Sequence, residues 1–238
     1  MAVTFHSGGA SSDDGIAGLC HEWPAKPSRR VWRRFTFDGP HCVLNRTNRK
    51  AHMNRIAWRA DPLVWGHGAR VFEVFLEPTC PYSVKAFGKL DDLLAQAGDD
   101  QITIKIRLQS QPWHMYSGVI VRCILAASTL EGGKAAAKAV MAAVADHRGE
   151  FEFDRHCGGP NLDATPNDII TRIEGYSGVK LREAFAIPDL DREIKWHCRY
   201  GRQNGIHVSP TFMIDGLVQP DMSSGDVVSD WVSRLLKT

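Results

Sequence analysis

Residues 71–83 read VFEVFLEPTCPYS, and this stretch decides the fold. Its first six residues are apolar and aromatic apart from one glutamate, which predicts a buried strand. Cys80 follows, and Pro81 suits the first position of a helix, where the missing N–H costs nothing. Apolar residues then recur at helical spacing as far as Gly98, which suits a helix exit. A thiol at a helix N-terminus faces unpaired N–H groups and the positive end of the helix dipole, so its reactive thiolate form is favoured.

The chain beyond this junction alternates again between strand and helix patterns. Residues 101–108 alternate apolar and polar side chains, which predicts a strand with one solvated face or an edge strand. Strand, helix and strand in this order predict a right-handed crossover and a parallel pair. Helical patterns fill roughly residues 113–207, including a helix capped by Thr165. Residues 211–214 return to strand, and Asp215-Gly216 is a two-residue hairpin signal.

The C-terminal part completes this pattern. Residues 217–218 continue the second strand of the hairpin, and Ser223 or Ser224 can cap a final helix. The fold class predicted is therefore α/β. The order of the elements resembles a thioredoxin-like fold with a helical domain inserted between the second strand and the proline-containing hairpin.

Two motifs carry a resemblance to a known family. The first is Cys80-Pro81-Tyr82-Ser83 after the strand, and the second is residues 208–212, Val-Ser-Pro-Thr-Phe, which enter the hairpin. With the helical stretch between them, the chain resembles the DsbA-like thioredoxin-fold family of thiol–disulfide oxidoreductases over about residues 69–237. The resemblance implies a helical insertion at about residues 113–207 and a domain at 69–238.

The resemblance also implies roles for individual residues. Cys80 matches the nucleophilic first cysteine of the family's C-x-x-C motif, and Pro81 and Tyr82 match its variable dipeptide. Pro210 matches the cis-proline that faces the active-site cysteine, so Ser209 takes the position whose backbone pairs with extended substrate. The implied activity is thiol–disulfide exchange with protein or small-molecule thiols and disulfides.

Ser83 departs from the family pattern, because the second cysteine stands there in the family. A lone Cys80 can form a mixed disulfide but cannot resolve it within the motif, so glutathione or a partner thiol is expected to do so. Ser83 can instead donate a hydrogen bond to the Cys80 sulfur. We expect no bound cofactor and no metal, with glutathione as a cosubstrate.

Two other functions stay open from the sequence. Kappa-class glutathione transferases and the related 2-hydroxychromene-2-carboxylate isomerases use a Ser-Pro-Tyr-Ser-like motif on a similar fold, so a glutathione-dependent transferase or isomerase is one alternative. A binding protein that has lost its redox chemistry is the other, because fold alone does not establish function.

The loop after the second strand adds two candidate residues. Residues 109–114 follow that strand at the end where parallel strands place their ligand-facing loops. Trp113 and His114 are therefore expected to border the Cys80 site. His114 can stabilise a thiolate or donate a proton to a leaving thiol, and the simpler interpretation is that both residues start a helix and pack on the sheet.

The first 68 residues differ from the rest of the chain. They carry a net charge of +5, whereas residues 69–238 carry −3, and they contain the basic cluster at 29–34 and several prolines. We expect a basic extension that is disordered or loosely packed, with nucleic-acid binding unlikely on so short a tract. Cys20-His21 and His41-Cys42 lack the spacing of zinc sites. Met53 is an alternative initiator.

The six cysteines are widely spaced in a chain of 238 residues, unlike the dense framework of small secreted domains. The N-terminus lacks the charged start and apolar stretch of a secretory signal, and no apolar run approaches the length that spans a bilayer. These features predict a cytoplasmic protein with free thiols. They leave the oligomeric state open.

Overall fold

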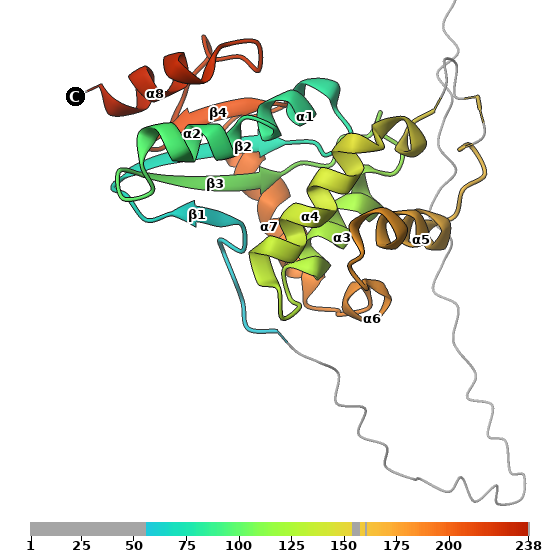
Figure 1. The fold of residues 1–238 in the computed structure, drawn as a ribbon. Helices are drawn as coiled ribbons and strands as arrows, with labels where there is room; N and C mark the ends of the chain where they lie inside the picture. The colour runs from blue at the N-terminus through green and yellow to red at the C-terminus, as the bar shows by residue number, and fades with distance from the viewer. Residues whose placement is uncertain (1–55, 154–157, 160, 238) are drawn as a thin grey trace, which may run out of the picture. The chain divides into compact units, whose positions relative to one another are not determined.

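A five-stranded mixed sheet forms the centre of the structure, a computed structural model that describes residues 56–153, 158–159 and 161–237. The strands are β1 (Val64–Gly66), β2 (Arg70–Leu76), β3 (Ile102–Leu108), β4 (Thr211–Ile214) and β5 (Leu217–Val218). They lie in the order β1-β3-β2-β4-β5, with β2 and β3 parallel and the other pairs antiparallel (Figure 1). The predicted parallel pair and α/β class are confirmed.

In the part of the chain that the structure describes, eight α-helices pack around this sheet (Figure 1). They are α1 (Pro81–Phe87), α2 (Leu90–Ala97), α3 (Ser117–Ala127), α4 (Gly133–Asp146), α5 (Pro166–Ser177), α6 (Arg182–Phe185), α7 (Leu190–Gln203) and α8 (Val228–Leu236), with a 3₁₀ turn at Arg148–Phe151. Helices α3 to α7 stand between β3 and β4 in the chain, which confirms the predicted insertion. The single helix expected up to Gly98 is two helices, because α1 ends at Gly88, a residue that weakens a helix interior.

One face of the sheet is apolar. Phe72 of β2 stacks on Phe212 of β4 with ring centroids 5.8 Å apart, and both rings contact Trp231 of α8 at 5.9 and 5.1 Å. Next to them, Ile104 and Ile106 of β3 are buried beneath α2. Each such side chain contributes roughly 1.5–3 kcal/mol by leaving water, so this face anchors α1, α2 and α8 on the sheet.

The opposite face carries a buried ion pair under α7. Arg107 of β3 is 3% exposed and donates from Nε to Glu73 of β2 at 2.8 Å. Its guanidinium also pairs with Asp61 and lies 4.7 Å from the Trp196 ring centroid and 4.9 Å from that of Tyr200. The expectation of a solvated face or an edge strand at 101–108 is therefore wrong. Antiparallel β1 covers the free edge of β3, and the paired carboxylates allow the guanidinium to be buried.

The domain begins before residue 69, which corrects the predicted boundary. Leu63 is 1% exposed, and β1 pairs with β3 through Val64, Trp65 and Gly66. Arg59 donates to Glu193 of α7 at 2.8 Å, so this segment is also tied to the helical insertion. A three-residue strand carries too weak an alternation for the sequence to reveal it. The expectations for the basic cluster, the Cys-His pairs and Met53 concern residues 1–55, which lie outside the described residues.

The turns and caps follow their sequence signals with one exception. Asp215 and Gly216 have φ values of 48° and 82°, as the predicted two-residue hairpin requires. Thr165 caps α5 in a capping box with Asp168, as expected. The last helix begins at Val228, and neither Ser223 nor Ser224 caps it. Ser223 instead exchanges hydrogen bonds with Asp226 in a separate turn before the helix.

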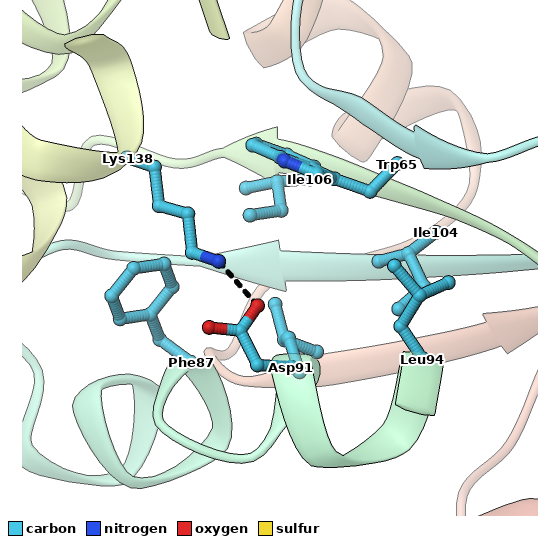
Figure 2. A pocket seen from close by; sticks show the side chains of 8 residues that line it. Trp65, Phe87, Asp91, Leu94, Ile104, Ile106 and Lys138 are labelled. Atoms are coloured by element: carbon cyan, nitrogen blue, oxygen red, sulfur yellow. Dashed lines mark hydrogen bonds and ion pairs between the residues drawn. The ribbon is translucent and has the colours of Figure 1, made fainter. Parts of the chain in front are cut away.

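A small apolar pocket lies between α2, β3 and α4 (Figure 2). Trp65, Phe87 and Ile106 line it, and an ion pair between Lys138 and Asp91 crosses its opening. The space amounts to about 10 Å³, which holds at most one water molecule. This pocket is a packing gap between the insertion and the sheet, and is too small for a ligand.

Candidate active site

Cys80 lies at the junction between β2 and α1, where the sequence places it. It is the N-cap residue of α1 with extended backbone angles, and Pro81 occupies the first helical position. The thiol is 7% exposed, and Sγ donates a hydrogen bond to the carbonyl oxygen of Ser209 at 3.5 Å. The start of α1 and the segment before β4 therefore meet at this sulfur, although they are 129 residues apart in the chain.

The segment that faces Cys80 contains Pro210, and the Ser209–Pro210 peptide bond is cis. The Ser209 hydroxyl lies 3.1 Å from Oε1 of Gln111, in the loop after β3. Gln111 in turn donates from Nε2 to the carbonyl of His207 at 3.4 Å. These contacts connect the loops that follow β3 and α7, so one side chain, Gln111, holds the segment whose Ser209 carbonyl faces Cys80.

Ser83 lies one turn into α1 and is 1% exposed. Its hydroxyl oxygen accepts the backbone N–H of Glu77 at 3.2 Å, and in the described residues it makes no hydrogen bond to Cys80. The hydroxyl therefore binds the backbone between β2 and the cysteine. The expected hydrogen bond from Ser83 to the sulfur is absent from this conformation, but the hydroxyl proton has no other acceptor among the described residues.

A buried carboxylate lies beneath the residue that precedes Cys80. Glu77 is fully buried, and its Oε2 accepts hydrogen bonds from the backbone N–H and the hydroxyl of Thr79, both at 2.9 Å. His114 Nδ1 lies 2.8 Å from Thr79 Oγ1 and 3.2 Å from Glu77 Oε2. Because the Thr79 proton goes to the carboxylate, Nδ1 of His114 is assigned as the donor, which leaves Nε2 unprotonated in the neutral ring.

The two aromatic candidates at the site are exposed. Tyr82 is 65% exposed on the first turn of α1, and Trp113 is 67% exposed on the loop after β3. Trp113 and His114 are adjacent rings with centroids 6.5 Å apart. His114 contacts Thr79, so the loop after β3 does border the segment that carries Cys80, as the position of parallel strand ends predicts.

The other two described cysteines have different surroundings. Cys123 is fully buried in α3, and burial raises the pKa of its thiol to about 12. Cys198 in α7 is partly buried, and burial also raises the pKa of its thiol. Both therefore stay protonated near neutral pH, whereas a thiol must ionise to attack a disulfide.

Several solved structures resemble this chain. A candidate protein-disulfide isomerase from Pseudomonas syringae is 76% identical, with a TM-score of 0.72 over 74% of this chain and 98% of that one. A protein-disulfide isomerase from Novosphingobium aromaticivorans (14% identity, TM-score 0.56, 75% and 100% covered) shares the fold. So does the thiol-disulfide exchange protein alpha-DsbA2 from Wolbachia pipientis (17% identity, TM-score 0.54, 73% and 86% covered).

These likenesses, together with the Cys80 junction and its facing loop, show that the chain belongs to the DsbA-like thioredoxin-fold family. Neither a protein-family profile nor a curated protein matches the chain.

The structure adds polar residues that the sequence did not single out. Glu77 and Thr79 stand in the decisive stretch, but no pattern distinguishes a buried carboxylate from a loop residue there. Gln111 lies in the loop already considered, and its contact with Ser209 depends on two segments that only the fold brings together. His197 is buried in α7 with Leu190, Glu193 and Gly201, and nothing in the sequence distinguished it from the exposed polar residues of that helix.

Proposed function

We propose that the protein is a thiol–disulfide oxidoreductase in which Cys80 is the exchanging thiol of a monothiol Cys-Pro-Tyr-Ser site. The observation that supports this most strongly is the contact between Cys80 Sγ and the Ser209 carbonyl at the N-terminus of α1. There the sulfur lies next to a backbone segment along which an extended substrate can align. Membership of a family of thiol–disulfide oxidoreductases supports the same activity.

The proposed reaction has two exchange steps. The Cys80 thiolate attacks one sulfur of a substrate disulfide, so a Cys80–substrate S–S bond forms and the substrate's own S–S bond breaks. The departing thiolate takes up a proton, for which His114 protonated at both ring nitrogens is the candidate donor, because the neutral ring carries its only proton at Nδ1. An external thiolate then attacks the mixed disulfide, which releases the substrate as a new disulfide and regenerates the Cys80 thiolate.

The surroundings of the other two described thiols support an external resolving thiol. Ser83 supplies no sulfur, Cys123 is fully buried, and burial raises the thiol pKa of both Cys123 and Cys198. Glutathione is the candidate cosubstrate because it is a small thiol that can reach a nearly buried sulfur.

Disulfides of polypeptides are the proposed substrates. A groove of about 540 Å³ runs beside Pro210, lined by apolar side chains that include Val208, Val218 and Met222. β5 is an edge strand of the sheet, and its Leu217 is 70% exposed. An extended peptide with apolar side chains fits such an edge. The name of the Pseudomonas syringae relative, a candidate protein-disulfide isomerase, supports the same substrate class.

A cytoplasmic location stays a prediction. Cys80, Cys123 and Cys198 are free thiols in the structure, which suits a reducing compartment. Within the part of the chain that the structure describes, none of the helices has the length and apolar character needed to cross a membrane. Cell fractionation with an antibody against the protein tests the location directly.

Alkylation of the reduced protein with iodoacetamide at about pH 6 tests the proposed thiol. Mass spectrometry of the peptides should show Cys80 labelled at least about tenfold faster than Cys123 and Cys198, because among these three described cysteines only Cys80 lies at a helix N-terminus. In denaturant all thiols should react alike. Equal, slow labelling of the native protein would contradict an activated Cys80 and favour a binding protein without redox chemistry.

Incubation with glutathione disulfide tests the exchange itself. We expect a glutathione adduct on Cys80 that excess glutathione removes, and no adduct in Cys80→Ser. Cys123→Ser is the matched control, in which the adduct should still form. If Cys80→Ser instead retains a glutathione-dependent transferase or isomerase activity, the kappa-type alternative gains support and the proposed monothiol mechanism fails.

A further inference from the structure

Four exposed cations follow one side of α7, and they are Arg192, Lys195, Arg199 and Arg202. Because they are three or four residues apart, they fall within about 80° of the helix circumference and extend over about 15 Å. The buried residues of the helix, among them His197 and Gly201, lie on the opposite side. These four cations are called the basic face of α7 below.

Little negative charge within the described residues balances the basic face. Asp191, the one exposed acidic residue of α7, pairs with Arg122 of α3. Among the described residues, only Arg192 of the basic face makes an ion pair, a contact of 3.9 Å with Asp189. Like charges three or four residues apart destabilise a helix, whereas a merely solvated face alternates its charges. An external anion would relieve this repulsion.

An open hollow adjoins the C-terminal end of the basic face. It has a volume of about 300 Å³ and is lined by Arg202, Gln111 and the exposed Trp113, with no acidic side chain of the described residues. Arginine and tryptophan are the side chains most enriched among those that dominate protein–protein binding. The hollow shares His207 with the groove beside Pro210, so the hollow and the groove border each other.

The charge of the rest of the domain indicates which anion fits. Residues 69–238 carry −3, so a long polyanion such as a nucleic acid meets repulsion beyond α7. Single-stranded nucleic acid also requires a basic groove, whereas the basic face is the convex side of a helix. A short polypeptide segment with glutamate or aspartate side chains matches a row of cations about 15 Å long.

We propose that the basic face of α7 and the adjoining hollow bind an acidic segment of the polypeptide substrate. The inference rests on the proposed function for the role of that polypeptide, whose extended part occupies the groove beside Pro210. Carboxylates of the acidic segment pair with Arg199 and Arg202, and a neighbouring side chain packs on Trp113 in the hollow. The protein therefore selects disulfides of acidic polypeptides.

Fluorescence anisotropy with a labelled, cysteine-free peptide of repeating Glu-Ala-Glu-Tyr tests this docking without any reaction. At about 10 mM salt, where screening is weak, the full-length protein should bind it more tightly than a peptide with Gln in place of Glu. The double variant Arg199→Gln/Arg202→Gln should weaken binding about tenfold, since each exposed ion pair contributes about threefold. Lys180→Gln/Lys237→Gln removes the same charge outside α7 and should bind as the wild type does.

The charge-preserving variant Arg199→Lys/Arg202→Lys separates loss of charge from damage to the helix. It should keep binding within about threefold of the wild type, because the cations remain exposed and unburied. Equal binding of the Glu and Gln peptides, wild-type binding by Arg199→Gln/Arg202→Gln, or tighter binding of an oligothymidine than of the acidic peptide would overturn the inference.

Exchange with the same peptides, each carrying one cysteine in a mixed disulfide with a small thiol, tests substrate selection. The Cys80 thiolate attacks the peptide sulfur, so a Cys80–peptide S–S bond forms and the small thiol leaves. The acidic peptide should react about tenfold faster than the Gln peptide, and Arg199→Gln/Arg202→Gln should abolish the difference. Equal rates in the wild type reject the docking surface alone, and peptide binding with an inert Cys80 rejects the exchange reaction alone.

Discussion

The two faces of the sheet are covered in different ways. The face under α2 and α8 is apolar, with Phe72, Phe212 and Trp231 in mutual contact. The face under α7 is polar, because Glu73 and Arg107 pair there and the ring of His197 lies buried beside them. Apolar burial is non-directional, whereas buried charges require specific partners. The apolar face therefore supplies stability, and the polar face fixes the position of α7.

Replacing Arg107 tests the polar face with the largest expected effect. Arg107→Leu leaves the buried Glu73 without its charged partner and should lower the free energy of unfolding by about 3–5 kcal/mol, measured by urea denaturation. Lys105→Leu is the control, because Lys105 lies on the same strand and face but pairs only with the partly exposed Asp61. It should cost less than about 1 kcal/mol. Equal losses of unfolding free energy in Arg107→Leu and Lys105→Leu would show that burial of the Glu73–Arg107 pair has no special effect on stability.

Acid should weaken the polar face selectively. The folded-state pKa of His197 is lowered to about 3, so below its ordinary value the unfolded chain takes up a proton that the folded protein does not. Stability from this group is present above about pH 6.5 and is lost as the pH falls toward 3. Between pH 7 and 5 the loss should be about 2 kcal/mol.

His197→Gln should remove most of this loss, because glutamine does not titrate but still offers an acceptor for the Leu108 N–H. Urea denaturation of both proteins at pH 7 and 5 makes the measurement. Asp61 does not titrate between pH 7 and 5: burial alone would raise its pKa, but hydrogen bonds from Arg107 and Lys105 outweigh burial and lower it. The contribution of Asp61 to the free energy of unfolding is therefore constant between pH 7 and 5. It is lost only as the pH falls from the ordinary aspartate pKa toward the lower pKa of the folded state. A loss that persists in His197→Gln would assign the acid sensitivity to another group.

A substitution on the apolar face should have a smaller effect that does not depend on pH. Phe72→Leu keeps the site apolar with less volume and should lower the free energy of unfolding by about 1–1.5 kcal/mol. The same difference is expected at pH 7 and at pH 5, since no titratable group is removed. A pH-dependent difference would indicate that the two faces are coupled through the sheet.

The smallest effect is expected where the two faces meet, at the end of β2. Glu77→Gln removes the charge that accepts the Thr79 hydrogen bonds and faces His114, so the rate of glutathione-adduct formation on Cys80 should fall about three- to tenfold. His114→Gln should give a similar loss, and the double variant little more, because both act through one contact. Glu150→Gln, an exposed carboxylate in the 3₁₀ turn, should leave the rate unchanged. Additive losses would show that Glu77 and His114 act separately.

Signals from neighbouring residues in the sequence predict much of this structure. The strand and helix around Cys80, the hairpin at Asp215-Gly216 and the cap at Thr165 each depend on neighbouring residues, so the sequence predicts them. The contact between Cys80 and Ser209 was expected through the family resemblance and not through any local pattern. The short β1 and the burial of Arg107 were missed, because each depends on what covers it from a distant part of the chain.

The sequence by itself determined the α/β class, the position of Cys80 at the start of a helix and the presence of serine at position 83, because helix termini and residue identity are local properties. Tertiary structure alone decided that Glu77, Thr79 and His114 share one hydrogen-bond network, and that His197 Nε2 and Gln109 Oε1 are buried without a hydrogen-bond partner among the described residues. Those groups come from separate strands, loops and helices. Only packing decides which buried polar atoms find partners within the chain and which do not.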